Sequence, residues 1–598
     1  MASLRPPGLG PLVGATTDHT CRIWIRAGDP ADRGVDLDAD RRTVGVIGLL
    51  SADRKQVKEA WYFRLQREYD RTGTFLLGEH VQLGYYPADY RDQIARDVIK
   101  TFPDPLPPQA IPIQLAPDTA YTVRCATLTI DDPMPNAASL PDWELVKRLP
   151  DIDNIKHELL SLDPNECEAR FRTFPVVKDI TEGRMSFLLG SCRYPGLLWK
   201  IKEADHIFGP MHAHFTDSSL GEPARYTIMC GDQIYADMLH RLFPIGRADT
   251  FAEFQERYMT AYAGPNLRKL LRSATTFMIL DDHEIEDNWT QDRIAEDGKH
   301  QLFNIAIGAY QSYQWSHSPR TFGQLFYYTF ECGGYPTFVL DTRTQRFKDE
   351  VSGLRDNHLL GRPNIDPDHP GQLKRLLDWL SQQQQRRGDV PKFIVTASVF
   401  VPNDMSERIA PVQGLFGTSG GNRKKTPSNM LFGEYWNAKR RDDSDSWPAF
   451  PATRLALLQH IVQNRIQNVV FLAGDIHCAN TATIDFDGKD GKGLKAFSVT
   501  SSAFYWPFPF ADGDPNSYVH DSRDPDQSDP FPVDGTDAVM HYESFGYTQD
   551  DNFTRLDLDK ASSTLTVRVF DRDGKPVRIG PHNAKKDLVN TLELAPWD

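Results

Sequence analysis

The sequence predicts an α/β protein in which an N-terminal all-β sandwich precedes a larger α/β domain. In the first 178 residues, polar and apolar residues alternate with the period of two that is typical of half-buried strands. From residue 183 onward, short apolar runs alternate with amphipathic helical patterns, which indicates βαβ units and a largely parallel sheet. We therefore expect two domains, 1–178 and 183–598, both with insertions.

Three segments define the expected sandwich. Residues 19–26 alternate polar and apolar side chains, and 171–175 read as a closing strand that ends at a proline. Between them, 115–128 form a proline-bearing turn followed by a strand, and Tyr121 resembles the corner tyrosine of immunoglobulin-like and fibronectin-like sandwiches. Cys21 and Cys125 could pair across such a sandwich, although seven widely spaced cysteines argue against a disulfide framework.

In the second domain, helical and strand patterns follow one another. Leucines at helical spacing from 373 to 380 precede an apolar run at 393–398, and a second helical pattern from 455 to 461 precedes the run that begins at Val469. The segment 553–578 alternates, with a turn expected at 571–574, and predicts a closing hairpin. The long polar insertion 401–447 is typical of a lid or a disordered segment, and the aromatic segment 503–510 either walls a pocket or packs beneath a loop.

Composition excludes several classes of protein. Of the 598 residues, 67 are basic and 82 acidic, and the resulting net charge of −15 argues against non-specific nucleic-acid binding. No apolar run reaches the roughly 18 residues that a membrane span needs. The N-terminus lacks a signal-peptide core and a twin-arginine motif, so we expect a cytoplasmic protein, or a periplasmic or secreted one whose signal was removed. The oligomeric state stays open.

Metal-binding and phosphate-binding side chains follow the predicted strands at their ends. Ligands of open α/β sheets bind in the crevice at the carboxyl ends of parallel strands, so we expect these side chains to share one site. Four apolar runs end in this way, with Cys192 after the first, Asp232 and Tyr235 after the second, Asp281, Asp282, His283 and Asn288 after the third, and Asp475 and His477 after the fourth.

The donor atoms divide into two kinds. The thiolate of Cys192, the phenolate of Tyr235 and the imidazole of His477 suit a transition metal. Asn288 and Asp475 offer only oxygen, which suits calcium, magnesium or manganese. Asp232 has two carboxylate oxygens and could bridge the two metals, whereas Asp281 is left out of the ligand set. Asp475 and His477 are two residues apart, so an extended exit from the strand would aim both side chains the same way.

The donor atoms thus imply two unlike metals side by side, and two-metal sites are the usual apparatus for hydrolysing phosphate esters. His283 could hydrogen-bond a phosphoryl oxygen or protonate the leaving alkoxide. Arg343 ends another apolar strand and could hold phosphate with its planar guanidinium, or only form a salt bridge with Asp341 or Asp282.

The motifs around these residues resemble those of the PhoD-like (alkaline phosphatase D) family of metallophosphoesterases. They are Gly190-Ser-Cys192, Gly231-Asp-Gln-Ile-Tyr235, Asp281-Asp-His-Glu-Ile-Glu-Asp-Asn288-Trp289, Asp341-Thr-Arg343 and Gly474-Asp-Ile-His477. The resemblance covers most of the chain, in order. It implies a layered α/β/β/α metallophosphoesterase domain after the sandwich.

The same resemblance implies the metals and the reaction. A ferric iron would be held by Cys192, Asp232, Tyr235 and His477, and a calcium ion by Asp232, Asn288 and Asp475, with zinc, manganese or magnesium as alternative metals. Asn288, His283 and Arg343 would contact the phosphate of a small phosphorylated substrate. The implied activity is phosphomonoesterase, phosphodiesterase or both. Two alternatives stay open: a phospholipase-D-like enzyme on lipid or polymer diesters, and a non-catalytic binding protein on a decayed phosphatase scaffold.

Overall fold

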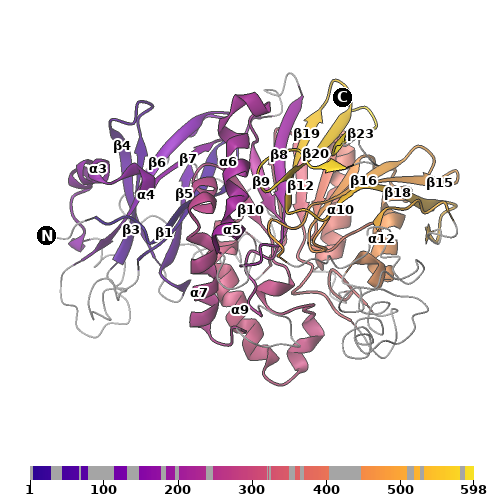
Figure 1. Cartoon of the computed structure of the whole chain (residues 1–598), viewed down its shortest axis with the longest axis horizontal. Helices are drawn as coiled ribbons and strands as arrows, with labels where there is room; N and C mark the ends of the chain where they lie inside the picture. The colour runs from indigo at the N-terminus through magenta and orange to yellow at the C-terminus, as the bar shows by residue number, and fades with distance from the viewer. Residues whose placement is uncertain are drawn as a thin grey trace.

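The computed structural model describes most of the chain, and two parts follow one another along its longest axis (Figure 1). The described residues are 4–28, 43–65, 69–78, 113–130, 147–176, 183–195, 201–237, 247–319, 321, 325–348, 357–363, 370–402, 446–507, 518–524, 531–579 and 586–597. The predicted domain boundary between 178 and 183 and nearly all of the 401–447 insertion fall outside them.

The N-terminal part consists of two antiparallel sheets around one apolar core. One sheet contains β1 (Leu9–Thr16), β2 (Thr20–Arg26) and β5 (Thr72–Gly78), and the other contains β4 (Val57–Arg64), β3 (Thr43–Leu50), β6 (Ala120–Thr129) and β7 (Glu168–Arg172). Ile23 of the first sheet and Val123 of the second belong to the same buried cluster, so the sheets pack face to face. The helices α3 (Ile152–Ser161) and α4 (Pro164–Cys167) follow β6 along the chain.

In the N-terminal part, Tyr121 contacts the preceding turn and two cysteines lie in the core. The backbone N–H of Ala116 donates to the hydroxyl of Tyr121 over 2.8 Å, which is the contact that a corner tyrosine makes with the preceding turn. Cys21 and Cys125 lie in the shared core as free thiols. The immunoglobulin-like assignment itself stays a prediction.

The larger part contains two sheets that face each other. The order in the six-stranded sheet is β10 (Thr275–Met278), β9 (Tyr226–Met229), β8 (Arg184–Gly190), β19 (Asn552–Asp559), β20 (Thr564–Asp571) and β23 (Val589–Glu593). The order in the eight-stranded sheet is β11 (Tyr328–Cys332), β12 (Tyr335–Val339), β13 (Lys392–Val395), β14 (Val469–Ala473), β16 (Lys495–Thr500), β15 (Ala479–Asp487), β18 (Val539–Thr548) and β17 (Phe531–Pro532). The strands β8, β9 and β10 run parallel, as do β12, β13, β14 and β16, and the parallel strands end in the candidate site.

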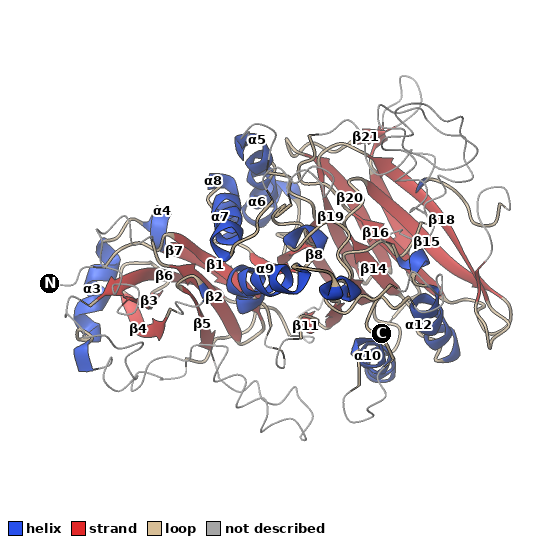
Figure 2. Cartoon of the chain, turned by 90° about the horizontal axis from the view of Figure 1, so that it is seen from below, coloured by secondary structure: helices blue, strands red, loops and turns tan. Residues whose placement is uncertain are grey.

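Apolar side chains fix the positions of the sheets and helices. A buried cluster between the sheets contains Leu189 of β8 and Leu472 of β14. On the outer face of the first sheet pack α6 (Phe208–Thr216), α7 (Phe251–Tyr262), α8 (Pro265–Leu271) and α9 (Lys299–Tyr313), and on that of the second pack α10 (Gln372–Arg387) and α12 (Pro451–Gln463). Figure 2 shows α9 in the middle of the molecule, between the N-terminal sheets and the parallel strands.

The predicted helices and hairpin are present, with one shift. Leu376 and Leu380 of α10 and Leu458 and Ile461 of α12 are buried, as their spacing indicated. The hairpin is β19–β20, but its reversal lies at 560–563, before β20, and the turn at 571–574 follows it. The turn expected at 571–574 is present, since the N–H of Gly574 donates to the carbonyl of Asp571 over 2.9 Å, but it does not join β19 to β20. Asp-Gly is only one of several sequences that reverse a chain.

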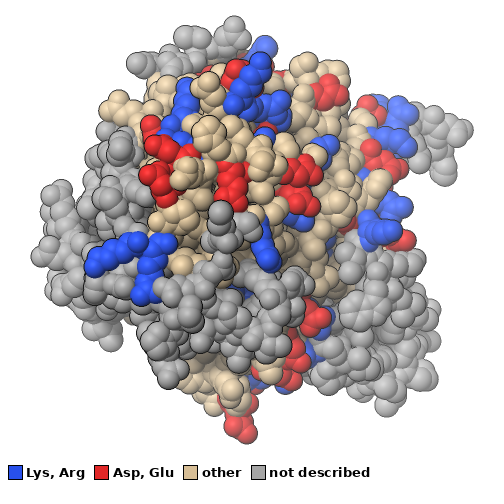
Figure 3. Space-filling view, turned by 90° about the vertical axis from the view of Figure 1, so that its left-hand side faces the viewer, with Lys and Arg blue, Asp and Glu red and all other residues tan. Residues whose placement is uncertain are grey.

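The outer surface mixes the two signs of charge. On the face shown in Figure 3, basic and acidic side chains of the described residues are interspersed. None of the helices in the described ranges is long and apolar enough to cross a membrane.

Candidate metal centre

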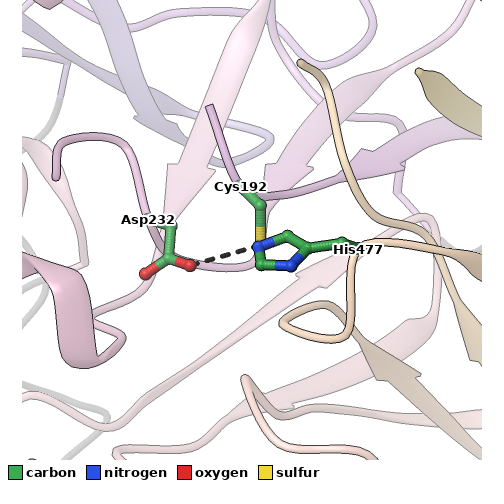
Figure 4. Close-up of side chains that lie close together, drawn as sticks. All are labelled: Cys192, Asp232 and His477. Carbon is green, nitrogen blue, oxygen red and sulfur yellow. Dashed lines mark hydrogen bonds between the residues drawn. The ribbon is translucent and has the colours of Figure 1, made fainter. Parts of the chain in front are cut away.

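Three predicted ligands converge from the ends of three strands, two in the six-stranded sheet and one in the eight-stranded sheet. Cys192 follows β8, Asp232 follows β9 and His477 follows β14, and one donor atom of each lies within 4.8 Å of the others. The Cys192 Sγ lies 3.2 Å from Asp232 Oδ2. Figure 4 shows the three side chains pointing toward one another. All three are buried, so together they form a closed cluster with sulfur, oxygen and nitrogen donors.

Tyr235 completes this group of donors. Its hydroxyl lies 3.4 Å from Asp232 Oδ2 and 3.3 Å from His477 Nε2. After β9 the chain turns at Asp232, whose backbone is left-handed. Tyr235 follows three residues later, so this turn brings both side chains to the same side. The four side chains that sequence reasoning grouped as transition-metal ligands are therefore neighbours, with thiol, phenol, carboxylate and imidazole groups in mutual reach.

A second cluster contains four carboxylates. Single oxygens of Asp232, Asp281, Asp282 and Asp475 all lie within 4.8 Å of one another. Asp232 belongs to both clusters, as its predicted bridging position requires. Sequence reasoning left both Asp281 and Asp282 out of the ligand set. The signal that could have found them is the pair of adjacent acids that follows β10 after two residues, at the same edge of the sheet as Asp232.

Asn288 is attached to this second cluster through its backbone. Its N–H donates to Asp282 Oδ2 over 2.6 Å, and its side-chain amide donates to Asp287 Oδ1 over 3.1 Å. With the amide nitrogen facing Asp287, the side-chain oxygen is the remaining donor atom of Asn288. Its ligand role stays a prediction.

Five of the six predicted ligands have left-handed backbone. The φ values are 56° for Cys192, 54° for Asp232, 54° for Asn288, 73° for Asp475 and 52° for His477. Residues other than glycine seldom adopt this conformation, because Cβ then crowds the following carbonyl. The extended exit expected for Asp475 and His477 was wrong: two left-handed residues aim these side chains. Unfavourable backbone concentrated at one place is typical of functional sites.

The electrostatics of the two clusters favour a bound cation. Burial, and next the neighbouring carboxylates of Asp232 and Asp475, raise the pKa of Cys192 well above its usual range. Burial likewise raises the pKa of Asp232 and of Tyr235. Asp232 Oδ1 is buried and has no hydrogen-bond partner among the residues that the structure describes. A cation would supply this missing partner and stabilise the ionised groups, so the donor set fits metal ions.

His283 is oriented by a carboxylate that sequence reasoning missed. Its Nδ1 lies 2.8 Å from Asp237 Oδ1, and its ring packs on the Tyr235 ring with 4.2 Å between centroids. Burial alone would lower the pKa of His283, but the charges of Asp237, Asp282 and Asp232 outweigh it and hold this pKa well above the usual value. Asp237 fixes Nδ1, so Nε2 is the nitrogen that remains for the site.

Arg343 lies against carboxylates. Its side chain is 0% exposed, and its Nε donates to Asp281 Oδ1. Its NH2 lies 3.5 Å from Asp282 Oδ1 and 3.9 Å from Asp475 Oδ2. The salt-bridge alternative is thus present with Asp282, while Asp341 accepts from the backbone N–H of Arg343 over 3.0 Å. The phosphate-binding role stays a prediction.

The aromatic segment covers one side of the site. The Trp506 ring stacks on His477, with 3.6 Å between ring centroids and 11° between planes. Its backbone N–H donates to Asp551 Oδ1 over 2.8 Å, which holds the segment in place. Residues 508–510 of the predicted aromatic segment lie outside the described residues.

Comparisons with known proteins point to one family. A family model described as PhoD-like phosphatase matches residues 208–521, a range that contains every predicted ligand except Cys192. Alkaline phosphatase D of Bacillus subtilis (strain 168) is 24% identical over 265 residues, which are 42% of this chain and 40% of that protein. The match thus spans less than half the length of this curated relative.

Solved structures give the fold. The "Structure of PhoD" is similar with a TM-score of 0.56 and 15% sequence identity, over 98% of this chain and 92% of the other. A structure titled "GAP50 the anchor in the inner membrane complex of Plasmodium" reaches a TM-score of only 0.27 at 9% identity, over 69% of this chain and 89% of the other. The first similarity supports the mixed α/β fold, and the second is too low to carry an argument.

Proposed function

The chain belongs to the PhoD-like phosphatase family, and from this premise we propose that it hydrolyses phosphate esters at a dinuclear metal centre. The observation that carries the proposal is the convergence of two unlike donor clusters on Asp232. A decayed scaffold would be expected to have lost a donor, whereas here the thiol, phenol, imidazole and carboxylates lie together.

We assign the first metal, ferric iron, to Cys192, Asp232, Tyr235 and His477. The second, calcium, is assigned to Asp232, Asn288 and Asp475, and the carboxylate cluster supports adding Asp282. Sulfur and nitrogen donors favour a transition metal, and a set of oxygens favours a hard cation. Zinc, manganese and magnesium are the alternatives to test.

When bound, the two cations would supply a nucleophile at neutral pH and neutralise charge on the phosphoryl oxygens. The chain's own groups have other tasks. His283, held through Nδ1 by Asp237, presents Nε2 to hydrogen-bond a phosphoryl oxygen or to protonate the leaving alkoxide. Arg343 holds the carboxylates of Asp281 and Asp282 in place and offers its guanidinium to phosphate at that edge of the cluster.

The architecture follows the same assignment. We propose that the two facing sheets with helices on their outer faces are the α/β/β/α layers of a metallophosphoesterase domain, 183–598. The preceding sheets would form an immunoglobulin-like or fibronectin-like domain, 1–178, and the contact between Tyr121 and the preceding turn supports this.

A paired assay tests the function. Purified protein is analysed for metals and then assayed with p-nitrophenyl phosphate and bis-p-nitrophenyl phosphate, before and after chelation and add-back of iron and calcium. We expect hydrolysis that chelation removes and that iron with calcium restores. The ratio of the two rates assigns monoester or diester preference. Hydrolysis of neither ester by the metal-loaded protein would overturn the function, and full recovery with zinc alone would overturn the metal assignment.

A further inference from the structure

Glu284 connects the ends of two strands that bear metal-site residues. Its side chain is completely buried, one residue beyond His283. The Oε2 atom accepts the backbone N–H groups of Asp232 over 3.0 Å and of Asp281 over 2.9 Å. The Oε1 atom accepts the backbone N–H of Gln233 over 2.6 Å. One carboxylate thus holds the chain after β9 to the chain after β10.

The position of this carboxylate calls for an explanation. Glu284 lies close to a cluster that already contains four carboxylates, so a negative charge on Glu284 is repelled by the charges of its neighbours. A buried carboxylate is tolerated where several N–H groups donate to it, because each donor replaces a lost water. Three of its bonds come from backbone N–H groups, and both segments that it joins contain residues of the second cluster. The arrangement therefore suits a side chain whose role is to fix the geometry of the two loops that follow β9 and β10.

Gln314 supplies the fourth donor to Glu284. It follows the last residue of α9, is completely buried, and its Nε2 donates to Glu284 Oε1 over 3.0 Å. The same nitrogen lies 3.1 Å from the hydroxyl of Tyr258, whose ring stacks on Tyr313 with 4.8 Å between centroids. Gln314 thus links the carboxylate to the C-terminal end of α9.

The N-terminal sheet holds this end of α9. Trp24 of β2 donates its indole N–H to the carbonyl of Ser312 over 2.8 Å, and Arg22 donates to the carbonyl of Ser316 over 2.7 Å. The hydroxyl of Tyr313 donates to Asp70, which lies just before β5. The last carbonyls of a helix lack partners within the helix, so donors from another domain can anchor its end.

We propose that Glu284 is a positioning residue for the metal centre, and that Gln314 and the N-terminal sheet hold it in place through the end of α9. The proposal rests on the proposed function for its metal centre. Partners that orient metal ligands usually change metal affinity about 10- to 100-fold when they are removed. In this arrangement the N-terminal sheet stabilises the position of the metal centre through the end of α9.

The first test compares Glu284→Gln and Gln314→Met with Gln467→Met. Gln467 makes side-chain bonds to Lys495 and Gly493 at the start of β16, at the opposite end of the parallel strands, so its variant controls for loss of a glutamine side chain. Hydrogen exchange of the metal-free proteins is followed by mass spectrometry in peptides that contain Asp232, Gln233 and Asp281. Mn²⁺ binding is measured from the electron paramagnetic resonance of the free ion.

We expect faster exchange confined to these peptides and Mn²⁺ binding weakened about 10-fold or more in the two test variants. The control should match the wild type in both measurements. Should Glu284→Gln fail to fold, Gln314→Met, which removes one of the four donors, carries the test. Wild-type exchange together with wild-type Mn²⁺ affinity in a folded variant would overturn the proposal.

The second test addresses the link to the sandwich. Tyr313→Phe removes the bond to Asp70, and Tyr62→Phe, whose hydroxyl donates to the carbonyl of Pro150 over 2.9 Å, is the matched control. Faster exchange at Asp281 in the first variant only supports the link, and equal exchange in both refutes it. Hydrogen exchange does not depend on turnover, so absence of phosphatase activity in the wild type would refute the proposed function and leave this test intact.

Discussion

At the scale of single residues, unfavourable backbone conformations are concentrated at the candidate metal centre. A left-handed residue other than glycine costs roughly 1–2 kcal/mol relative to the right-handed region. Cys192, Asp232, Asn288, Asp475 and His477 all adopt it, although none of them is a glycine. Stability alone would favour glycine at these positions, so the side chains are better explained by what they bind.

Asp475→Gly separates the two effects. We expect the metal-free variant to be more stable by roughly 0.5–1 kcal/mol, because glycine relieves the left-handed strain and one carboxylate leaves the acidic cluster. Mn²⁺ should raise its Tm much less than that of the wild type. Ser563→Gly, at a left-handed position with φ of 53° in the β19–β20 turn, is the control. It should gain similar stability and keep the full Mn²⁺ response, as measured by calorimetry with and without Mn²⁺.

Arg343→Met distinguishes a structural role from phosphate binding. The guanidinium is completely buried against Asp281, and removal of one partner of a buried pair typically costs about 3–5 kcal/mol. Urea unfolding should show such a loss, and Arg343→Met with Asp281→Asn should recover part of it. Arg172→Met removes the half-exposed pair with Asp118 and should cost at most about 1 kcal/mol. An unchanged unfolding free energy with lost phosphate affinity would leave phosphate binding as the main role of Arg343.

At the scale of elements, the segment after β16 contacts His477, one of the proposed metal ligands. Ser502 accepts the backbone N–H of His477 over 3.2 Å, and Trp506 stacks on its ring. We expect Trp506→Leu to lower kcat/KM for p-nitrophenyl phosphate about 10-fold, because the imidazole loses the surface that orients it. Mn²⁺ should quench tryptophan fluorescence in the wild type and much less in Trp506→Leu. Trp597→Leu, near the C-terminus and packed on Tyr335, is the control and should keep both properties.

The sequence predicted strands and their ends better than the turns that follow. The apolar runs before Cys192, Asp232 and Asp281 became three neighbouring strands of one sheet, and the run before Asp475 became β14 of the facing sheet. Strands that are buried on both faces need nearly continuous apolar runs, which is why the sequence revealed them. The left-handed turns at Asp475 and His477 could not be predicted from residue types, since neither position is itself a glycine. The reversal at 560–563 was missed for the same reason, because Lys-Ala-Ser-Ser contains no typical turn dipeptide.

At the scale of the whole molecule, the contacts between distant segments could not be predicted from the sequence. The family motifs identified Cys192, Asp232, Tyr235 and His477 as a set, and the structure brings them together. Asp237 and Gln314 were missed because each acts through another side chain, and residue type and spacing carry no signal of that. The attachment of α9 to the N-terminal sheet joins residues about 290 positions apart, as in the bond from Trp24 to Ser312.

Buried histidines give the whole molecule a predictable response to acid. Burial, and next the charge of Arg555, lower the pKa of His214 from 6.5 to about 4. In the folded protein the His214 ring accepts from Arg555 over 3.2 Å and packs edge-on against Phe553 and Phe570, which favours its neutral form. Burial also lowers the pKa of His520 to about 4.

The sign of the effect follows from proton uptake. Between pH 6.5 and 4 the unfolded chain binds a proton at His214 that the folded protein does not, so stability rises with pH across this window and is lost as pH falls. For His214 the full loss is about 3 kcal/mol, at 1.36 kcal/mol for each pKa unit. In His214→Asn, the urea unfolding free energy should fall less steeply between pH 6.5 and 4.5 than in the wild type, whatever its value at pH 7. His157→Asn, at an exposed position of α3, should keep the wild-type slope. Equal slopes in all three proteins would mean that His214 is protonated in the folded state.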